Sequence, residues 1–113
     1  MRFVTRLAVV ALLLVAVGCA SSAAAKPVST THVEMPPSYR FDPTVIQVPV
    51  GATVTWHNAD NFTHSVHLLD GSNVDKVAHP GDSISITFTR AGEYRYECSF
   101  HPQDMKGRVI VTP

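Results

Sequence analysis

Short runs of alternating apolar and polar residues fill the chain from Thr31 onward, and none has the spacing of an amphipathic helix. The clearest run covers residues 83–88, where Ile84, Ile86 and Phe88 take every second position. Because successive side chains of a β-strand point to opposite faces, this spacing predicts a strand with one buried face. Comparable runs predict further strands over residues 32–35, 45–48, 52–57, 63–69, 93–98 and 108–112.

Turn-forming residues separate these runs, among them Pro36-Pro37, residues 70–73 and Ala91-Gly92. About seven short strands with frequent turns are typical of an all-β domain and predict an antiparallel Greek-key β-sandwich. We expect this domain to cover residues 32–113, since no repeat, coiled-coil segment or second domain is evident.

The first 19 residues have the pattern of a signal peptide. Arg2 and Arg6 precede an apolar run, residues 7–17, that is too short to cross a bilayer. Residues 16–19, Ala-Val-Gly-Cys, resemble the lipobox of bacterial lipoproteins, and we favour this processing site. The alternative is cleavage near residue 25, after the small residues 23–25.

Residues 20–31 are small and polar without apolar periodicity, which predicts a flexible tether. A lipid on Cys19 would be the one contact with a membrane. We therefore expect an exported protein, in the periplasm or on the outer face of the cytoplasmic membrane, and lipid-anchored.

The charge balance and the cysteine count exclude some classes of function. Nine basic residues balance nine acidic ones, and loss of Arg2 and Arg6 with the signal leaves 7 − 9 = −2. A nucleic-acid-binding protein would need a basic surface, so we do not expect this protein to bind nucleic acid. We also expect it to be a monomer. Once Cys19 is lipidated or removed, Cys98 has no cysteine to pair with. A lone exported thiol is normally buried or bound to a metal.

The segment after the predicted strand 93–98 carries candidate metal ligands. Cys98, His101 and Met105 follow the spacing Cys-x2-His-x3-Met. A thiolate, an imidazole and a thioether are ligands that suit copper, and two histidines, one cysteine and a weak axial methionine are typical of a blue-copper site. Structural zinc sites do not use methionine. Strand alternation places Cys98 on the buried side.

A second histidine is needed, and His64 is the best placed candidate, 34 positions before Cys98. His67 lies two positions further on and is expected to point away from the centre reached by His64. His32, His57 and His79 are interpreted as surface or loop residues, and a second, weaker metal site among these four histidines stays open.

Three segments together resemble the cupredoxin family of the plastocyanin and amicyanin type. Residues 41–58 resemble the early strands of that family, and Thr-His-Ser-Val-His (63–67) resembles the segment of its first copper ligand. Residues 92–111 resemble the Cys-His-Met ligand loop with its two strands.

This resemblance implies that one copper ion is bound by His64, Cys98, His101 and Met105, and that the protein shuttles single electrons between redox partners through Cu(I) and Cu(II). It also implies an apolar patch around His101 where redox partners dock. The candidate residues of this patch are Phe100, Pro102 and Phe62.

Two positions depart from the family pattern. Three residues separate His101 from Met105, where plastocyanins have four and amicyanins two. Ser65 follows the first histidine, where the family commonly has an asparagine that ties the two ligand loops together.

Other functions remain to be compared with electron transfer. The alternative is a copper buffering or delivery protein for an exported copper enzyme, since the same ligands would serve. We do not expect an enzyme, because Glu97 and Ser99 flank the cysteine where multicopper oxidases have histidines. A binuclear copper centre of the oxidase type is also not expected, because it would need a second cysteine nearby. The plainest alternative is a metal-free β-sandwich used for adhesion or as a spacer.

Overall fold

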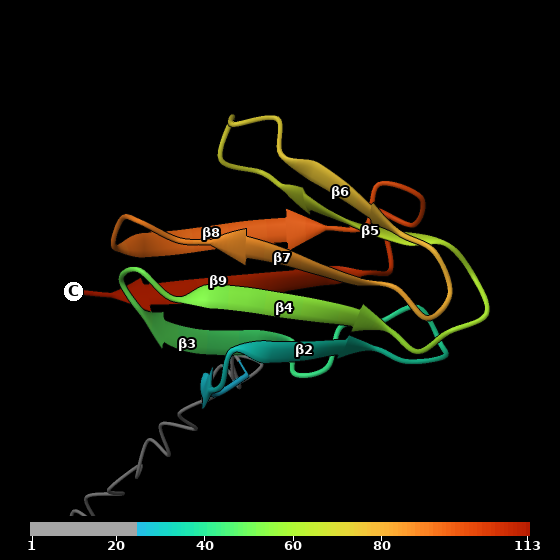
Figure 1. The fold of residues 1–113 in the computed structure, drawn as a ribbon, viewed down its shortest axis with the longest axis horizontal. Coiled ribbons are helices and arrows are strands. Elements are labelled where there is room, and N and C mark those ends of the chain that lie inside the picture. Colours follow the sequence, from blue (N-terminus) through green and yellow to red (C-terminus); the bar gives the residue numbers. More distant parts are fainter. Residues whose placement is uncertain (1–24) are drawn as a thin grey trace, which may run out of the picture.

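The computed structural model describes residues 25–113, which contain nine β-strands and no helix (Figure 1). Within this part of the chain nothing resembles a membrane-spanning helix. The predicted signal peptide, its favoured cleavage site before Cys19 and residues 20–24 of the predicted tether lie outside the described residues. The strands are β1 (Val28–Ser29), β2 (His32–Met35), β3 (Val45–Pro49), β4 (Thr53–Asn58), β5 (His64–Leu68), β6 (Asp75–Ala78), β7 (Ser83–Thr87), β8 (Gly92–Glu97) and β9 (Lys106–Thr112).

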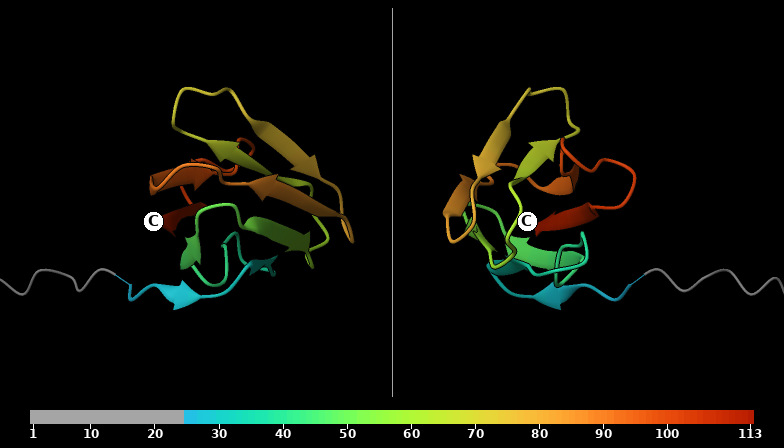
Figure 2. Two further views of the ribbon diagram at one scale, coloured as in Figure 1. Left: turned by 60° about the vertical axis from the view of Figure 1, so that its left-hand side comes forward. Right: turned by 90° about the vertical axis from the view of Figure 1, so that its right-hand side faces the viewer.

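The strands form two sheets that pack face to face as a sandwich (Figure 2). The larger sheet has the order β1-β3-β9-β8-β5-β6, and the smaller has the order β2-β4-β7. The predicted all-β sandwich is therefore confirmed, but the prediction of about seven antiparallel strands needs correction. There are nine strands, and the pairs β1/β3, β2/β4 and β3/β9 are parallel.

The physical reason for this difference is that side-chain alternation indicates which face of a strand is buried, not the direction of its neighbour. Strands β3 and β4 are consecutive in sequence but lie in different sheets. The edge strands β1 and β6 have too few alternating apolar residues to be recognised, since β6 buries only Ala78. Strand β1 falls within the predicted tether 20–31 and pairs with Ile46 and Gln47 of β3.

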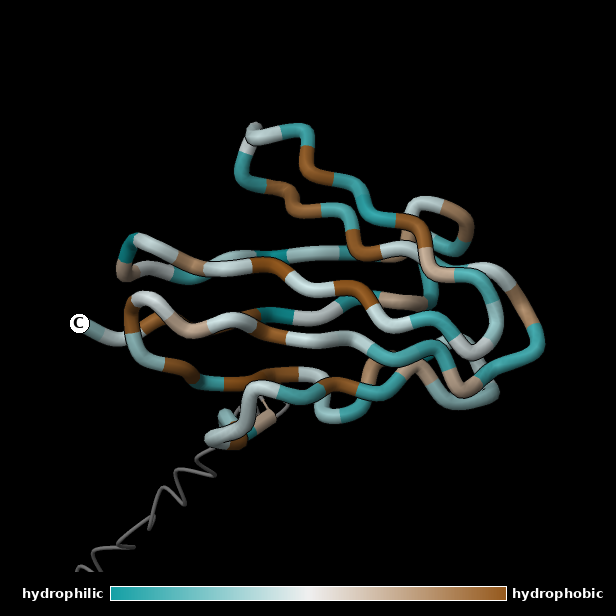
Figure 3. The backbone as a smooth tube through the Cα atoms, viewed as in Figure 1, coloured by the Kyte–Doolittle hydropathy of each residue, from teal (hydrophilic) through white to brown (hydrophobic). Residues whose placement is uncertain are grey.

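The core lies between the two sheets, where apolar positions of the strands alternate with polar ones (Figure 3). Trp56 is fully buried, and its ring meets that of Tyr96 edge to face at a centroid distance of 5.4 Å. The ring of Phe41 also packs edge to face against Tyr96, at a centroid distance of 4.7 Å. Burial of each such ring contributes about 1.5–3 kcal/mol. Tyr96, the shared member of this cluster, lies in β8 two residues before Cys98.

The hairpin of β8 and β9 positions the loop that carries the candidate ligands. Its antiparallel register begins with Gly92 opposite Val111 and ends with Glu97 opposite Lys106. One residue further, the backbone N–H of Cys98 donates to the carbonyl of Met105 at 3.1 Å. The hairpin register therefore brings Cys98 and Met105 face to face at the base of the loop.

Gly107 allows this hairpin to accept the large ring of Tyr96. The two residues are cross-strand partners, and the Tyr96 ring lies over the Gly107 backbone. A Cβ atom at residue 107 would lie inside van der Waals contact with the ring and hydroxyl of Tyr96. Because the Tyr96 ring also packs edge to face against Trp56 and Phe41, moving it away from residue 107 would disturb these core contacts.

We expect Gly107→Ala to lower the free energy of unfolding by about 1–3 kcal/mol, the usual cost of overpacking a core. Denaturant unfolding of the metal-free protein measures it. In a Tyr96→Leu background, where the ring is absent, the same substitution should cost less than about 0.5 kcal/mol. An equal cost in both backgrounds would contradict the steric explanation.

Candidate metal centre

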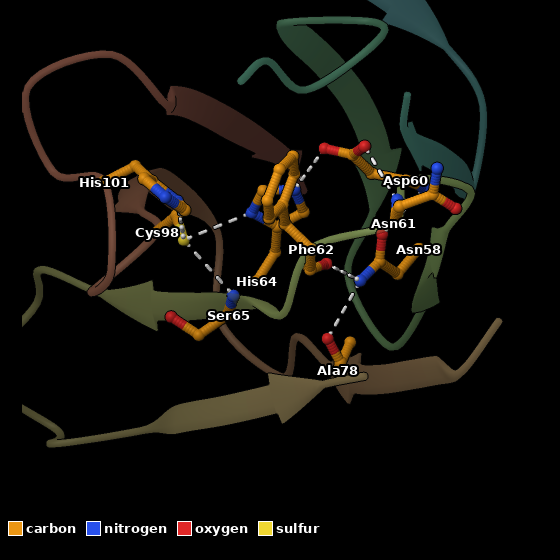
Figure 4. A network of polar contacts seen from close by, with 9 residues as sticks. All are labelled: Asn58, Asp60, Asn61, Phe62, His64, Ser65, Ala78, Cys98 and His101. Atoms are coloured by element: carbon orange, nitrogen blue, oxygen red, sulfur yellow. Dashed lines mark hydrogen bonds and ion pairs between the residues drawn. The ribbon is translucent and has the colours of Figure 1, made fainter. Parts of the chain in front are cut away.

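Three candidate ligand side chains converge at one end of the sandwich (Figure 4). His64 begins β5, Cys98 directly follows β8, and His101 lies in the loop before β9. Cys98 Sγ lies 3.8 Å from His64 Nδ1 and 3.6 Å from His101 Nδ1. Within residues 25–113 this is the one group of three or more histidine, cysteine or acidic side chains whose donor atoms meet closely enough to hold a metal ion.

The separations of these donors fit a single bound metal ion. An ion about 2.0–2.3 Å from nitrogen and sulfur donors, at angles between tetrahedral and trigonal, separates the donors by about 3.6–3.8 Å. The observed sulfur–nitrogen distances, 3.8 and 3.6 Å, lie in this range. Thiolate and imidazole donors, with a buried thioether nearby in sequence, are the set that copper prefers.

The ligand loop is closed by its own backbone. The N–H of His101 donates to the carbonyl of Cys98 at 3.1 Å, and the N–H of Met105 donates to the carbonyl of His101 at 3.0 Å. Three residues between His101 and Met105 thus make one tight turn that returns the chain to β9. Cys98 and Met105 are completely buried, whereas His101 is partly exposed.

Ser65 connects the two segments that carry the ligands. Its backbone N–H donates to Cys98 Sγ at 3.4 Å. Its hydroxyl accepts from the N–H of Ser99 at 2.8 Å and lies 2.7 Å from the Ser99 hydroxyl. Ser99 in turn donates to Asp75 of β6 at 3.3 Å. The shorter side chain at position 65 therefore still ties the loops together, because a serine stands opposite it.

Asp60 is a buried partner of His64 that the sequence did not reveal. Its Oδ2 lies 2.8 Å from His64 Nε2, on the side of the imidazole opposite Cys98, and its side chain is only 6% exposed. The hydrogen bond from His64 outweighs burial and lowers the pKa of Asp60, so the carboxylate is ionised at neutral pH. The sequence indicated only a turn here, and no motif marks Asp60 as a partner of histidine.

Tyr39 is a second side chain that the sequence did not single out. Its ring lies 4.5 Å from the ring of His101 and stacks on Phe62 at 5.9 Å. Both Ser38 and Tyr39 adopt left-handed backbone conformations, with φ of 83° and 54°. Residues other than glycine adopt this conformation at a cost of about 1–3 kcal/mol, and such strain is concentrated at functional sites.

Together with Tyr39, the exposed rings of Phe62 and Phe100 give this end of the molecule an apolar surface. Phe62 is 56% exposed and Phe100 is 53% exposed, values unusual for phenylalanine in a small domain. Of the residues predicted to surround His101, which are Phe62, Phe100 and Pro102, Phe62 lies near it because it stacks on Tyr39, which packs on the His101 ring.

The remaining histidines lie apart from this centre. His32 and His57 both contact the carboxylate of Glu34 on the outer face of β2 and β4. The hydrogen bond from His32 is the largest effect that lowers the pKa of Glu34. His67 points away from the centre, as expected, and its Nδ1 lies 4.0 Å from Glu97 Oε1. His79 Nδ1 lies near the hydroxyl of Thr63. In residues 25–113 no second group of donor atoms converges on one point.

The fold and the convergent cysteine and histidines define a small β-sandwich with a copper-type centre at one end. The cupredoxin-like domain family matches residues 8–111, and the chain belongs to this family. The cofactor of the family is a copper ion, and the donor set fits it.

Two amicyanins are among its relatives. Amicyanin-alpha of Methylorubrum extorquens is 30% identical over 101 residues, which cover 85% of this chain and 83% of the relative. Amicyanin of Paracoccus denitrificans is 37% identical over 78 residues, 64% of this chain and 58% of that protein.

Plastocyanin of Scenedesmus fuscus is 34% identical over 83 residues, which cover 63% of this chain and 85% of the relative. Among solved structures, a purple cupredoxin from Nitrosopumilus maritimus has a TM-score of 0.65 at 29% identity and covers 72% of this chain and 98% of its own. An oxidised amicyanin variant has a TM-score of 0.66 at 31% identity, with 72% of this chain and 80% of that chain covered.

We expect Ser65→Ala to lower the free energy of unfolding of the metal-free protein by about 1–3 kcal/mol, because the Ser99 N–H loses its acceptor in a part-buried place. Ser85→Ala is the matched control: its hydroxyl bonds Thr55 on an exposed face and should cost less than about 0.5 kcal/mol. Denaturant unfolding compares the two. Equal costs would mean that Ser65 does not tie the ligand loops.

Proposed function

We propose that this protein is an exported type 1 copper protein that carries single electrons between redox partners, with one copper ion held by His64, Cys98, His101 and Met105. The observation that carries the proposal is the convergence of a buried thiol and two imidazole nitrogens at the separations that a single metal ion requires. A bound copper ion supplies the one-electron couple between Cu(I) and Cu(II).

Each of the four residues has a distinct role in this proposal. Cys98 is the thiolate ligand, and the N–H of Ser65 donates to its sulfur. His64 and His101 would bind the ion through their Nδ1 atoms, which lie near Cys98 Sγ, and Met105 would supply a weakly binding thioether. The hairpin register and the bonds of Ser65 hold these residues in place. A frame that moves little when the charge changes allows rapid electron transfer.

The partner-docking patch proposed for this protein surrounds His101. Phe62 and Phe100 are exposed there, Pro102 follows the ligand, and Tyr39 packs on the imidazole. An exposed apolar patch with a polar surround is typical of a surface that binds another protein. His101 is the partly exposed histidine of the three-residue group, which makes it the shortest route from the centre to a docked partner.

The cellular location of the protein is also a proposal. The relatives named amicyanin and plastocyanin support a redox role, and the signal-like residues 1–19 support export. A lipid on Cys19 would place the domain, as a monomer, on the outer face of the cytoplasmic membrane.

Copper delivery is less well supported than electron transfer. A delivery protein has to release its ion to an acceptor, which favours exposed ligands. His64, Cys98 and Met105 are completely buried, so the set would retain its ion.

Copper binding is tested by an optical spectrum of the protein loaded with Cu(II). We expect an intense visible band from thiolate-to-copper charge transfer, and its complete loss in Cys98→Ser. Ser99→Ala is the control that changes the neighbouring residue without removing a ligand, and it should keep the band. A protein without this band would rule out the type 1 site.

Electron transfer is tested by the self-exchange rate between Cu(I) and Cu(II) protein. We expect Phe100→Asp to slow the exchange at least tenfold, because a charge interrupts the patch through which two molecules approach. Val50→Asp is the matched control, since Val50 is also exposed but its N–H bonds Thr112 at the far end of β9. Transfer of copper to an apo-acceptor without electron exchange would support delivery instead.

A further inference from the structure

A buried carboxylate lies directly behind one of the proposed ligands. His64 has no exposed surface, and its Nδ1 faces Cys98 Sγ while its Nε2 lies 2.8 Å from Asp60 Oδ2 (Figure 4). Asp60 is therefore too far around the ring to act as a ligand itself. An ionised carboxylate accepts hydrogen bonds only, so Nε2 must carry the proton and Nδ1 is left free to bind the metal.

The loop between β4 and β5 holds this carboxylate rigidly. The N–H of Asn61 donates to Asp60 Oδ1 at 2.7 Å, and the N–H of Asp60 donates to Asn58 Oδ1 at 2.9 Å. The amide of Asn58, itself fully buried, donates to the carbonyls of Phe62 and Ala78 at 2.8 and 2.9 Å. The Asp60 charge is thus fixed relative to His64 by a network that reaches β6.

The charge of Asp60 would act differently on the two oxidation states of a bound copper ion. With bound Cu(II), one thiolate and neutral histidines the centre would carry one positive charge, and with Cu(I) it would carry none. Asp60 is the acidic side chain that contacts this group, and no lysine or arginine of residues 25–113 forms an ion pair with it. With only 6% of its side chain exposed, Asp60 is weakly screened by solvent; its negative charge would attract the oxidised centre and would have no net charge to attract in the reduced one.

We propose that Asp60 is a positioning residue that holds His64 with Nδ1 directed at the copper ion and lowers the reduction potential of the centre. This inference rests on the proposed function, and it adds a determinant of the potential outside the four ligands. Outer partners of metal-bound histidines commonly fix the ring and raise the basicity of the ligand.

The potential is measured by titrating the copper-loaded protein against a reference couple. Asp60→Asn keeps an oxygen that can accept from His64 Nε2 and removes the charge. We expect it to favour the reduced form by about tenfold or more, which corresponds to about 59 mV for a one-electron couple. Asp104→Asn, which removes an exposed carboxylate from the ligand loop, is the matched control and should change the equilibrium less than twofold. Equal shifts in the two variants, or a lower potential in Asp60→Asn, would overturn the role in the potential.

Metal-free protein tests the positioning role independently of copper. We expect the Nε2 proton of His64 to give a slowly exchanging NMR signal, displaced downfield by the carboxylate. In Asp60→Ala it should exchange at least tenfold faster, while Asp60→Glu should restore part of the protection. Protection that survives Asp60→Ala would overturn the positioning role. Because this measurement needs no metal, it still tests the Asp60–His64 pair if the copper proposal fails.

Discussion

The hydrogen-bonded register of β8 and β9 is the constraint on which the rest of the centre depends. The ladder ends with Glu97 opposite Lys106, and the bond from Cys98 to Met105 continues it by one residue. A slip by one position would turn Cys98 to the outer face and away from His64. The close fit of the Tyr96 ring on Gly107 opposes such a slip, because no other residue of β9 lacks a side chain. Packing of the core thereby determines the geometry of the metal ligands.

Much of this organisation could be predicted from the sequence because it depends on local pattern. The period of two in residues 83–88 and 93–98 predicted the inward-facing side chains: Ile86, Phe88, Tyr96 and Cys98 are buried, and Ile84 and Tyr94 are partly buried against the core. The need for a second histidine then predicted that His64 lies close to Cys98, 34 positions further on. In the structure, His64 Nδ1 lies 3.8 Å from Cys98 Sγ. Strand direction and the edge strands β1 and β6 could not be predicted, since they depend on crossings between the sheets and on pairing with distant residues.

The residues that surround the candidate ligands could not be predicted from the sequence. Asp60 precedes His64 by four residues, a spacing that implies contact on a helix but has no fixed meaning in a loop. The hydroxyls of Ser65 and Ser99 meet only because two loops fold against each other. Tyr39 reaches His101 through a backbone conformation that no sequence pattern announces. Such contacts depend on how the loops fold against each other, and that folding depends on residues far apart in the sequence.

The two histidines of the centre have different surroundings, and this asymmetry has an evolutionary consequence. His64 is enclosed and hydrogen-bonded to a charge, whereas His101 is partly exposed and bordered by aromatic rings. In the proposed carrier, changes behind His64 would alter the driving force of electron transfer, and changes around His101 would alter which partner binds and how fast. In such a carrier, the reduction potential and the choice of partner would depend on separate segments of the chain. Selection could then adjust one without disturbing the other, and a single small fold could adapt to different redox partners.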